Sequence, residues 1–84
     1  MKVAADISLY PLDQDFIPPI KDVIDRLNKH EGLEVRTNAM STQVVGEFAD
    51  VMQALTAEIG ETFSTVDKSV FVIKLLNDPI AGQD

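Results

Sequence analysis

The sequence has no cysteine, few basic residues and no long apolar run, and each absence disfavours a class of function. Without cysteine there are no disulfides, no thiolate metal ligands and no thiol catalysis. Seven Lys and Arg residues against fourteen Asp and Glu residues give a net charge of −7, which disfavours nucleic acid and anionic membrane surfaces as partners. His30 is the single histidine and has no cysteine or second histidine beside it, so no metal site is expected.

The length of 84 residues predicts one domain over residues 1–84. The N-terminus reaches Asp6 without an apolar signal-peptide core, and no apolar run approaches the ~20 residues of a membrane span, so we expect a cytoplasmic protein. A small domain with neither disulfides nor a metal often gains stability by self-association. A homo-oligomer is therefore expected.

Hydrophobic periodicity predicts four strands and two helices. Alternation of apolar and polar residues predicts strands at residues 3–10, 33–38, 41–48 and 69–76, and helical spacing predicts helices at residues 16–31 and 49–63. The order β-α-β-β-α-β is that of a ferredoxin-like α+β fold, a four-stranded antiparallel sheet with two helices on one face. The tail from about residue 79 to Asp84 is predicted to be mobile.

Finer features follow from individual residues. We predict that Asp13 or Asp15 caps the first helix and that Gly32 ends it. Gly46, inside the third strand, indicates a bulge or close approach by another backbone or a ligand. The fourth strand is largely apolar on both faces, which predicts burial on both sides.

The second helix carries two predicted faces. Its inner stripe consists of apolar residues three or four positions apart: Met52, Leu55, Ile59 and Phe63. Its solvent face consists of the polar residues left over: Asp50, Glu58, Glu61 and Thr62.

Two groups of residues are candidates for binding a small polar molecule. The stretch 38–47 gathers small and hydroxyl-bearing residues around Met40, where strands that only fill a core would carry more branched apolar residues. Asp6, Ser8 and Tyr10 share one face of the first strand because side chains alternate along a strand. The candidate ligand-binding residues are therefore Asp6, Ser8, Tyr10, Asn38, Met40, Ser41, Thr42 and Glu47.

Each candidate also has a structural interpretation. Asp6 could be a charged residue that prevents another strand from pairing with a sheet edge, or it could form an ion pair with Arg36 or Lys74. Tyr10 could cap the core, Met40 could fill a gap, and Glu47 could terminate its strand. The hairpin residues Asn38, Ser41 and Thr42 could simply shape a turn, and Ser8 could be an ordinary surface hydroxyl.

Three segments together resemble the thiamine-binding protein family, small ferredoxin-like proteins that bind thiamine or its hydroxymethylpyrimidine moiety. They are DISLYPL at residues 6–12, MST at residues 40–42 running into VVGE at residues 44–47, and, less specifically, IKL at residues 73–75. The chain departs from the family pattern at Ser41, where many relatives have glycine, and at Gln43, where an apolar residue is frequent. The resemblance implies a non-enzymatic binding protein with no cofactor, which forms dimers or dimers of dimers through the sheets.

Competing functions are weighed against the same residues. Thiamine requires a carboxylate to bind its amine, hydroxyl or amide groups to bind its ring nitrogens, and an apolar surface against which its ring can lie. The candidate residues could supply all three. The alternative is an oligomeric regulatory or protein-interaction module with no small-molecule ligand, supported by the apolar fourth strand. An acylphosphatase-like hydrolase needs a phosphate cradle and an arginine near the first loop, but residues 11–15 are acidic and contain neither Gly nor Arg. RNA recognition would need aromatic platforms and basic charge on the sheet, which are lacking.

Overall fold

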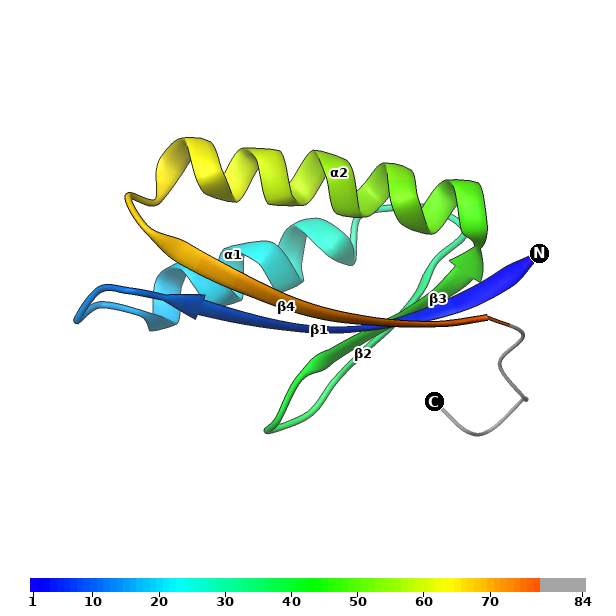
Figure 1. Ribbon diagram of the computed structural model, residues 1–84, viewed down its shortest axis with the longest axis horizontal. Coiled ribbons are helices and arrows are strands. Elements are labelled where there is room, and N and C mark those ends of the chain that lie inside the picture. Colours follow the sequence, from blue (N-terminus) through cyan, green and yellow to red (C-terminus); the bar gives the residue numbers. More distant parts are fainter. Residues whose placement is uncertain (78–84) are drawn as a thin grey trace.

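The chain folds as two helices packed on one face of a four-stranded antiparallel sheet (Figure 1). The computed structural model describes residues 1–77. Its elements are β1 (Lys2–Pro11), α1 (Ile17–Leu27), β2 (Glu34–Thr37), β3 (Thr42–Glu47), α2 (Phe48–Thr65) and β4 (Ser69–Asn77), and the strand order is β2-β3-β1-β4. The predicted ferredoxin-like α+β fold is confirmed. The predicted mobile tail from about residue 79 lies outside the described residues.

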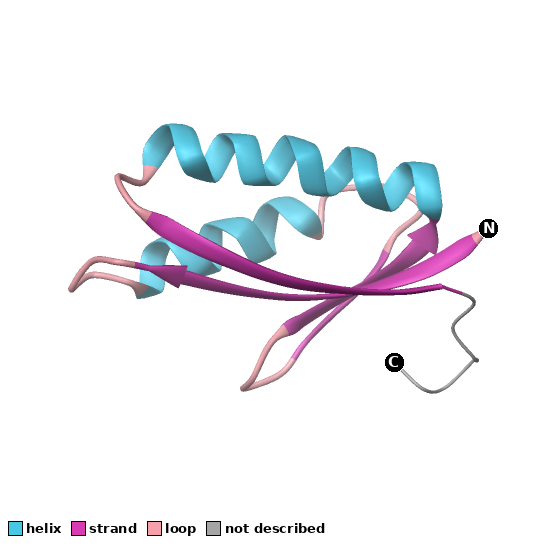
Figure 2. Cartoon of the chain, viewed as in Figure 1, coloured by secondary structure: helices cyan, strands magenta, loops and turns pink. Residues whose placement is uncertain are grey.

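The core lies between the helices and the sheet (Figure 2). Alternation along β1 sends every second side chain toward the helices and leaves Ala4, Asp6 and Ser8 on the open face. The buried apolar cluster is contributed by β1, α1, β3 and α2: Val3, Ala5, Ile7, Val23, Leu27, Val44, Val51 and Leu55.

Helix α1 begins without the side-chain cap that the sequence suggested. Phe16 is the N-cap residue and makes no side-chain capping bond, and two prolines occupy the first turn. Because proline has no N–H, fewer donors need a partner there. The Oδ1 atom of Asp13 instead accepts the amide of Asp15 at 3.1 Å within the preceding loop, so the predicted cap is wrong.

Helix α1 also ends earlier than predicted, at Leu27. The side-chain amide and the main-chain N–H of Asn28 both donate to the carbonyl of Ile24, at 2.8 and 3.1 Å, and the chain then continues in tighter turns. Gly32 has a φ of +81°, which favours glycine, but it lies in the loop before β2 rather than at the helix end. Within residues 1–77, neither helix is long and apolar enough to cross a membrane.

The face that α2 buries agrees with the predicted stripe in part: Leu55 is buried, and Met52 and Ile59 pack against the core. The buried residues are Val51, Ala54, Leu55, Glu58 and Thr62, while Phe63 is 55% exposed. The Phe63 ring lies edge-on against Phe71, with centroids 5.7 Å apart, at the margin of the core. The prediction that Glu58 and Thr62 face solvent is therefore wrong.

A polar cluster between the helices explains this burial. Arg26 donates from Nε to Oε1 of Glu58 at 2.6 Å and from Nη2 to Oγ1 of Thr62 at 2.9 Å, while His30 Nε2 lies 2.7 Å from Oε2 of Glu58. Burial alone would raise the pKa of Glu58, but the hydrogen bonds from His30 and Arg26 outweigh it and lower that pKa below its usual value. These bonds tie α1 to α2.

Strand β4 lies at the edge of the sheet. Its open-face side chains Val70, Val72 and Leu76 are each about half exposed, so the prediction of burial on both sides is wrong for a single chain. The pairing of β3 with β1 continues through Gly46 without a bulge. A Cβ at Gly46 would lie 2.7 Å from Cδ2 of Leu33, so the predicted close approach is real and comes from the chain entering β2.

Candidate ligand-binding site

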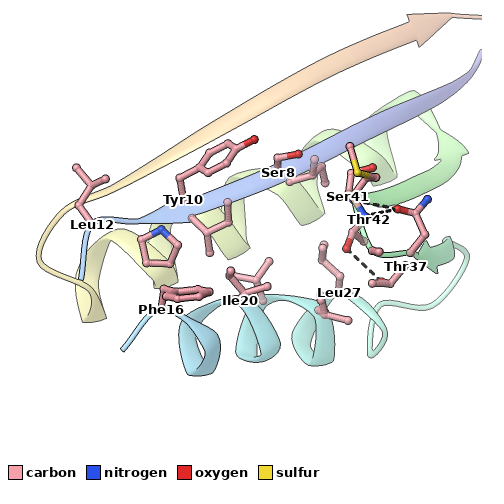
Figure 3. A pocket seen from close by; sticks show the side chains of 17 residues that line it. Ser8, Tyr10, Leu12, Phe16, Ile20, Leu27, Thr37, Ser41 and Thr42 are labelled. Atoms are coloured by element: carbon pink, nitrogen blue, oxygen red, sulfur yellow. Dashed lines mark hydrogen bonds between the residues drawn. The ribbon is translucent and has the colours of Figure 1, made fainter. Parts of the chain in front are cut away.

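A cavity opens where β1 runs on past the end of its neighbour β3. Strand β3 pairs with β1 only from Lys2 to Ile7, whereas β4 follows β1 as far as Pro11. The stretch 8–11 therefore has one edge without a neighbouring strand. Helix α1 lies below this edge, and the tip of the β2–β3 hairpin closes one end (Figure 3).

The cavity has an apolar wall and a polar rim. Its volume is about 520 Å³, within the range of small-molecule sites. The wall comes from α1, the loop before it and the inner face of β1: Ile7, Leu9, Pro11, Leu12, Phe16, Ile20, Val23, Ile24 and Leu27. The rim comes from the open face of β1 and from the hairpin: Ser8, Tyr10, Thr37, Asn38, Ala39, Met40, Ser41 and Thr42.

The hairpin tip is held in shape by Asn38. Its Oδ1 atom accepts the amides of Met40 at 2.7 Å and Ser41 at 3.0 Å, and its own N–H donates to the carbonyl of Ser41 at 3.0 Å. An asparagine that bonds to the backbone two and three residues on is a stable turn device. It presents the side chain of Met40, 85% exposed, at the margin of the cavity.

Two further hydrogen bonds fix the polar rim. Ser41 Oγ donates to Oδ1 of Asp6 at 2.6 Å, joining the hairpin to the open face of β1. On the helix-facing side, the hydroxyls of Thr37 and Thr42 lie 3.1 Å apart, and Thr42 is buried. The hydroxyls of Thr37, Ser41 and Thr42 therefore stand in defined positions around the cavity, and Asp6, which does not line it, holds Ser41 in place.

The structure brings most of the predicted site residues together. Six of the eight line the cavity: Ser8, Tyr10, Asn38, Met40, Ser41 and Thr42. Asp6 joins them through Ser41. Glu47 lies apart, at the far end of β3, where its Oε2 atom is 3.1 Å from the N-terminal amine. Whether any of these residues contacts a ligand stays a prediction.

Sequence reasoning missed the wall that α1 contributes. The apolar spacing of Ile20, Val23, Ile24 and Leu27 was visible, but it was used only to predict a helix. Part of this stripe faces the cavity because β3 stops before covering the outer half of β1. Across residues 1–77, no group of three or more His, Asp or Glu side chains could hold a metal ion.

A family model for YKOF-related proteins matches residues 2–75. The chain belongs to the YKOF-related family. The matched residues include all six elements described above except the last two residues of β4. No curated protein matches the chain.

Solved structures share the fold. A Streptococcus pneumoniae protein is 24% identical, with a TM-score of 0.89 over 99% of this chain and 93% of its own. A hypothetical protein from Methanocaldococcus jannaschii is 28% identical, with a TM-score of 0.80 over 93% of this chain and 81% of its own. A Thermotoga maritima protein described as a candidate thiamine biosynthesis/salvage protein is 19% identical, with a TM-score of 0.80 over 89% and 82% of the two chains.

Proposed function

We propose that this protein binds thiamine or its hydroxymethylpyrimidine moiety without chemical change, in the cavity between β1, α1 and the β2–β3 hairpin. The observation that carries the proposal is the pairing of an apolar wall with a rim of hydroxyl and amide groups, one of which, Ser41, is bonded to the carboxylate of Asp6. An aromatic ring can lie against the wall while its polar edge meets the rim.

Charge and relatives support the same ligand. The net charge of −7 favours a cation such as the thiazolium of thiamine, and Asp6 places a carboxylate beside the rim. The Thermotoga maritima neighbour is described in connection with thiamine biosynthesis or salvage. The role would be storage, salvage or delivery of the ligand in the cytoplasm.

A non-catalytic role fits the groups around the cavity. Nucleophilic catalysis needs a nucleophile within hydrogen-bond reach of an activating base. Ser41 Oγ is within such reach of Asp6, to which it donates at 2.6 Å, but in residues 1–77 no third group bonds to Asp6 to orient it as a base. The remaining hydroxyls bond to one another or lie on the rim. Such groups bind and orient a ligand, so the protein is proposed not to be an enzyme.

Isothermal titration calorimetry with thiamine and with hydroxymethylpyrimidine tests the proposal. We expect saturable binding at about one ligand per subunit or per dimer. Asp6→Ala removes a charged hydrogen-bond acceptor, worth roughly 1.5–3 kcal/mol, and should weaken binding about tenfold or more. Thr42→Ala should also weaken binding, by less.

The control variant is Glu61→Ala, which makes the same charge change on the exposed surface of α2. It should leave affinity unchanged, and circular dichroism should show all variants folded. Absence of heat and of any thermal shift at millimolar ligand would refute the proposal. Full affinity in both the Asp6 and Thr42 variants would move the site elsewhere on the chain.

The open face of the sheet favours self-association, with the ligand site near the subunit interface. Tyr10, Val70, Val72 and Leu76 all lie on this face and are about half exposed. Across the middle of the face, Asp6 stands opposite Lys74 in the strand register, so two copies could pair apolar residues and opposite charges. We propose a homodimer or a dimer of dimers built through this face.

This surface also carries the second candidate function, an oligomeric interaction module with no small-molecule ligand. Light scattering on wild type and on Val72→Lys tests the interface, and calorimetry on the wild-type oligomer separates the two candidate functions. We expect the charge at position 72 to produce a monomer, because a lysine would be buried in the interface. An oligomer that binds neither thiamine nor hydroxymethylpyrimidine would favour the second function, and a wild-type monomer would refute both oligomer proposals.

A further inference from the structure

The main chain of β1 alternates between its two neighbouring strands. The carbonyl of Met1 accepts the amide of Phe48 at 2.9 Å on the β3 side, and the amide of Leu12 donates to the carbonyl of Lys68 at 2.9 Å on the β4 side. In an antiparallel ladder the N–H and C=O of one residue point to the same neighbour, and the next residue points to the other. Odd-numbered residues of β1 therefore bond toward β3, and even-numbered residues toward β4.

Leu9 is the first odd-numbered residue beyond the reach of β3. The last paired residues are Ile7 and Thr42, and the continued register would place Met40 opposite Leu9. Asn38 holds Met40 in the turn instead. Within residues 1–77, no strand supplies the missing partner, so the N–H and C=O of Leu9 point to the open edge that borders the cavity.

Pro11 is independent evidence for this open edge. It lies in β1 and is paired in register with Ser69 of β4. Proline cannot donate to a ladder and is tolerated only where its nitrogen faces no partner strand. As an odd-numbered residue, Pro11 turns its nitrogen to the same edge as Leu9, so no hydrogen bond of the ladder is lost.

We propose that the main chain of Leu9 binds the ring edge of the ligand: its N–H donates to a ring nitrogen and its C=O accepts from an adjacent exocyclic amine. The ligand class is a planar heteroaromatic ring with an amine next to a ring nitrogen, as in a 4-aminopyrimidine. This inference rests on the proposed function and adds the chemical group that the site selects. In a sheet, the N–H and C=O of one residue bond to the C=O and N–H of the residue opposite. A ring nitrogen and an adjacent amine offer the same acceptor and donor side by side, so they can take the place of that residue.

A peptide strand fits this edge less well than a small ring. Only Leu9 offers both a donor and an acceptor there, because the next odd-numbered position is Pro11. The hairpin tip at Asn38 and Met40 blocks extension in the other direction. A ligand that needs a single pair of main-chain hydrogen bonds and an apolar wall for its ring is the better match.

Solution NMR on the 15N-labelled full chain tests the proposal directly. Titration with 4-amino-5-hydroxymethyl-2-methylpyrimidine should shift the Leu9 amide downfield and slow its hydrogen exchange tenfold or more. The amides of Val3 and Ala5, which face β3 in the ladder, are internal controls and should move little. The analogue that lacks the 4-amine, 2-methyl-5-hydroxymethylpyrimidine, has no donor for the Leu9 carbonyl and should bind at least tenfold more weakly.

An amide-to-ester replacement gives a second measurement. Replacing the Leu9 amide by an ester removes the donor but no ladder bond, so ligand affinity should fall about tenfold while the urea midpoint stays unchanged. The matched control is an ester at Ile7, whose amide faces Thr42 in the ladder and whose loss should lower the urea midpoint.

The outcomes separate this inference from the proposed function. If the aminopyrimidine binds but the Leu9 amide does not move and the analogue without the 4-amine binds equally well, the inference is overturned and the binding function stands. If neither the aminopyrimidine nor thiamine binds at millimolar concentration, the proposed function fails and this inference fails with it.

Discussion

Replacing Glu58 by glutamine should destabilise the protein by about 2 kcal/mol at neutral pH. The variant keeps the shape of the side chain but removes the charge that Arg26 and His30 face at 2.6 and 2.7 Å. Hydrogen bonds to a charged group contribute roughly 1.5–3 kcal/mol each when buried. The side chains of Arg26 and His30 are 27% and 31% exposed, so solvent screening reduces this value, and we expect about 2 kcal/mol in total.

Urea unfolding followed by circular dichroism measures the change. With a slope of roughly 1 kcal/mol per molar for a domain of this size, the midpoint should fall by about 2 M. Protein concentration is held constant because an oligomer makes the midpoint depend on it. The control is Glu61→Gln, one turn further along α2 and exposed, which should change stability by less than about 0.5 kcal/mol.

The stabilisation by Glu58 should also depend on pH, in a direction that follows from its pKa. The pKa of Glu58 is lowered in the folded protein, so its contribution is fully present above the ordinary value of 4.5 and is lost as pH falls through the lower folded-state pKa. The stability difference between wild type and Glu58→Gln should therefore disappear in acid. A loss below about 0.5 kcal/mol at neutral pH, or a difference that persists after Glu58 is protonated, would refute this account of the cluster.

Three smaller changes test other parts of the fold by urea unfolding. Gly60→Ala should raise stability by about 0.5–1 kcal/mol, because Gly60 lies in α2 with nothing within 4 Å of an added Cβ; a loss would contradict this. Gly46→Ala should cost about 1–3 kcal/mol, since the new Cβ would lie 2.7 Å from Leu33 Cδ2 and 3.2 Å from the carbonyl oxygen of Gly32; a neutral result would show that the loop yields freely. Asn38→Ala should cost about 1 kcal/mol and speed hydrogen exchange at the amides of residues 40 and 41, because both lose their acceptor; unchanged exchange there would rule out the turn.

The order of elements was predictable because each carries a clear hydrophobic period. Val3, Ala5 and Ile7 alternate in β1, and the spacing of Ile20, Val23 and Leu27 is helical, so type and sequence of elements agree with the structure. The end of α1 was not predictable from period alone. The side chain of Asn28 donates to the carbonyl of Ile24, and the spacing of apolar residues gives no information about this hydrogen bond.

The buried face of α2 was mispredicted because polarity was taken as a sign of exposure. Glu58 and Thr62 are polar, yet they are buried because Arg26 on α1 bonds to both and His30, in the loop after α1, bonds to Glu58. These partners lie 28 to 36 residues away in the sequence. No pattern within a single helix can reveal a pairing that only the packing of two helices creates.

The side-chain groups of the candidate site could be predicted from the sequence, but its main-chain groups could not. Side-chain groups such as Ser8, Ser41 and Thr42 could be proposed from their residue types. The donor and acceptor of Leu9 could not, because every residue has a main chain and the sequence does not say which main-chain groups lack a partner. Pro11 held the available signal: the predicted strand stopped at residue 10, whereas Pro11 lies within the register of β1 and turns its nitrogen to the unpaired side.

The cavity itself follows from unequal strand lengths rather than from any special residue. Strand β1 has 10 residues, while β3 has 6 and β2 has 4, so the hairpin covers only the first part of the central strand. Helix α1 crosses beneath the uncovered part and turns apolar side chains toward it. A hairpin two residues longer on each strand would pair Leu9 and fill the space. The length of the β2–β3 hairpin therefore sets whether the edge of β1 at Leu9 is covered, and the residues at the hairpin tip line the cavity that opens there.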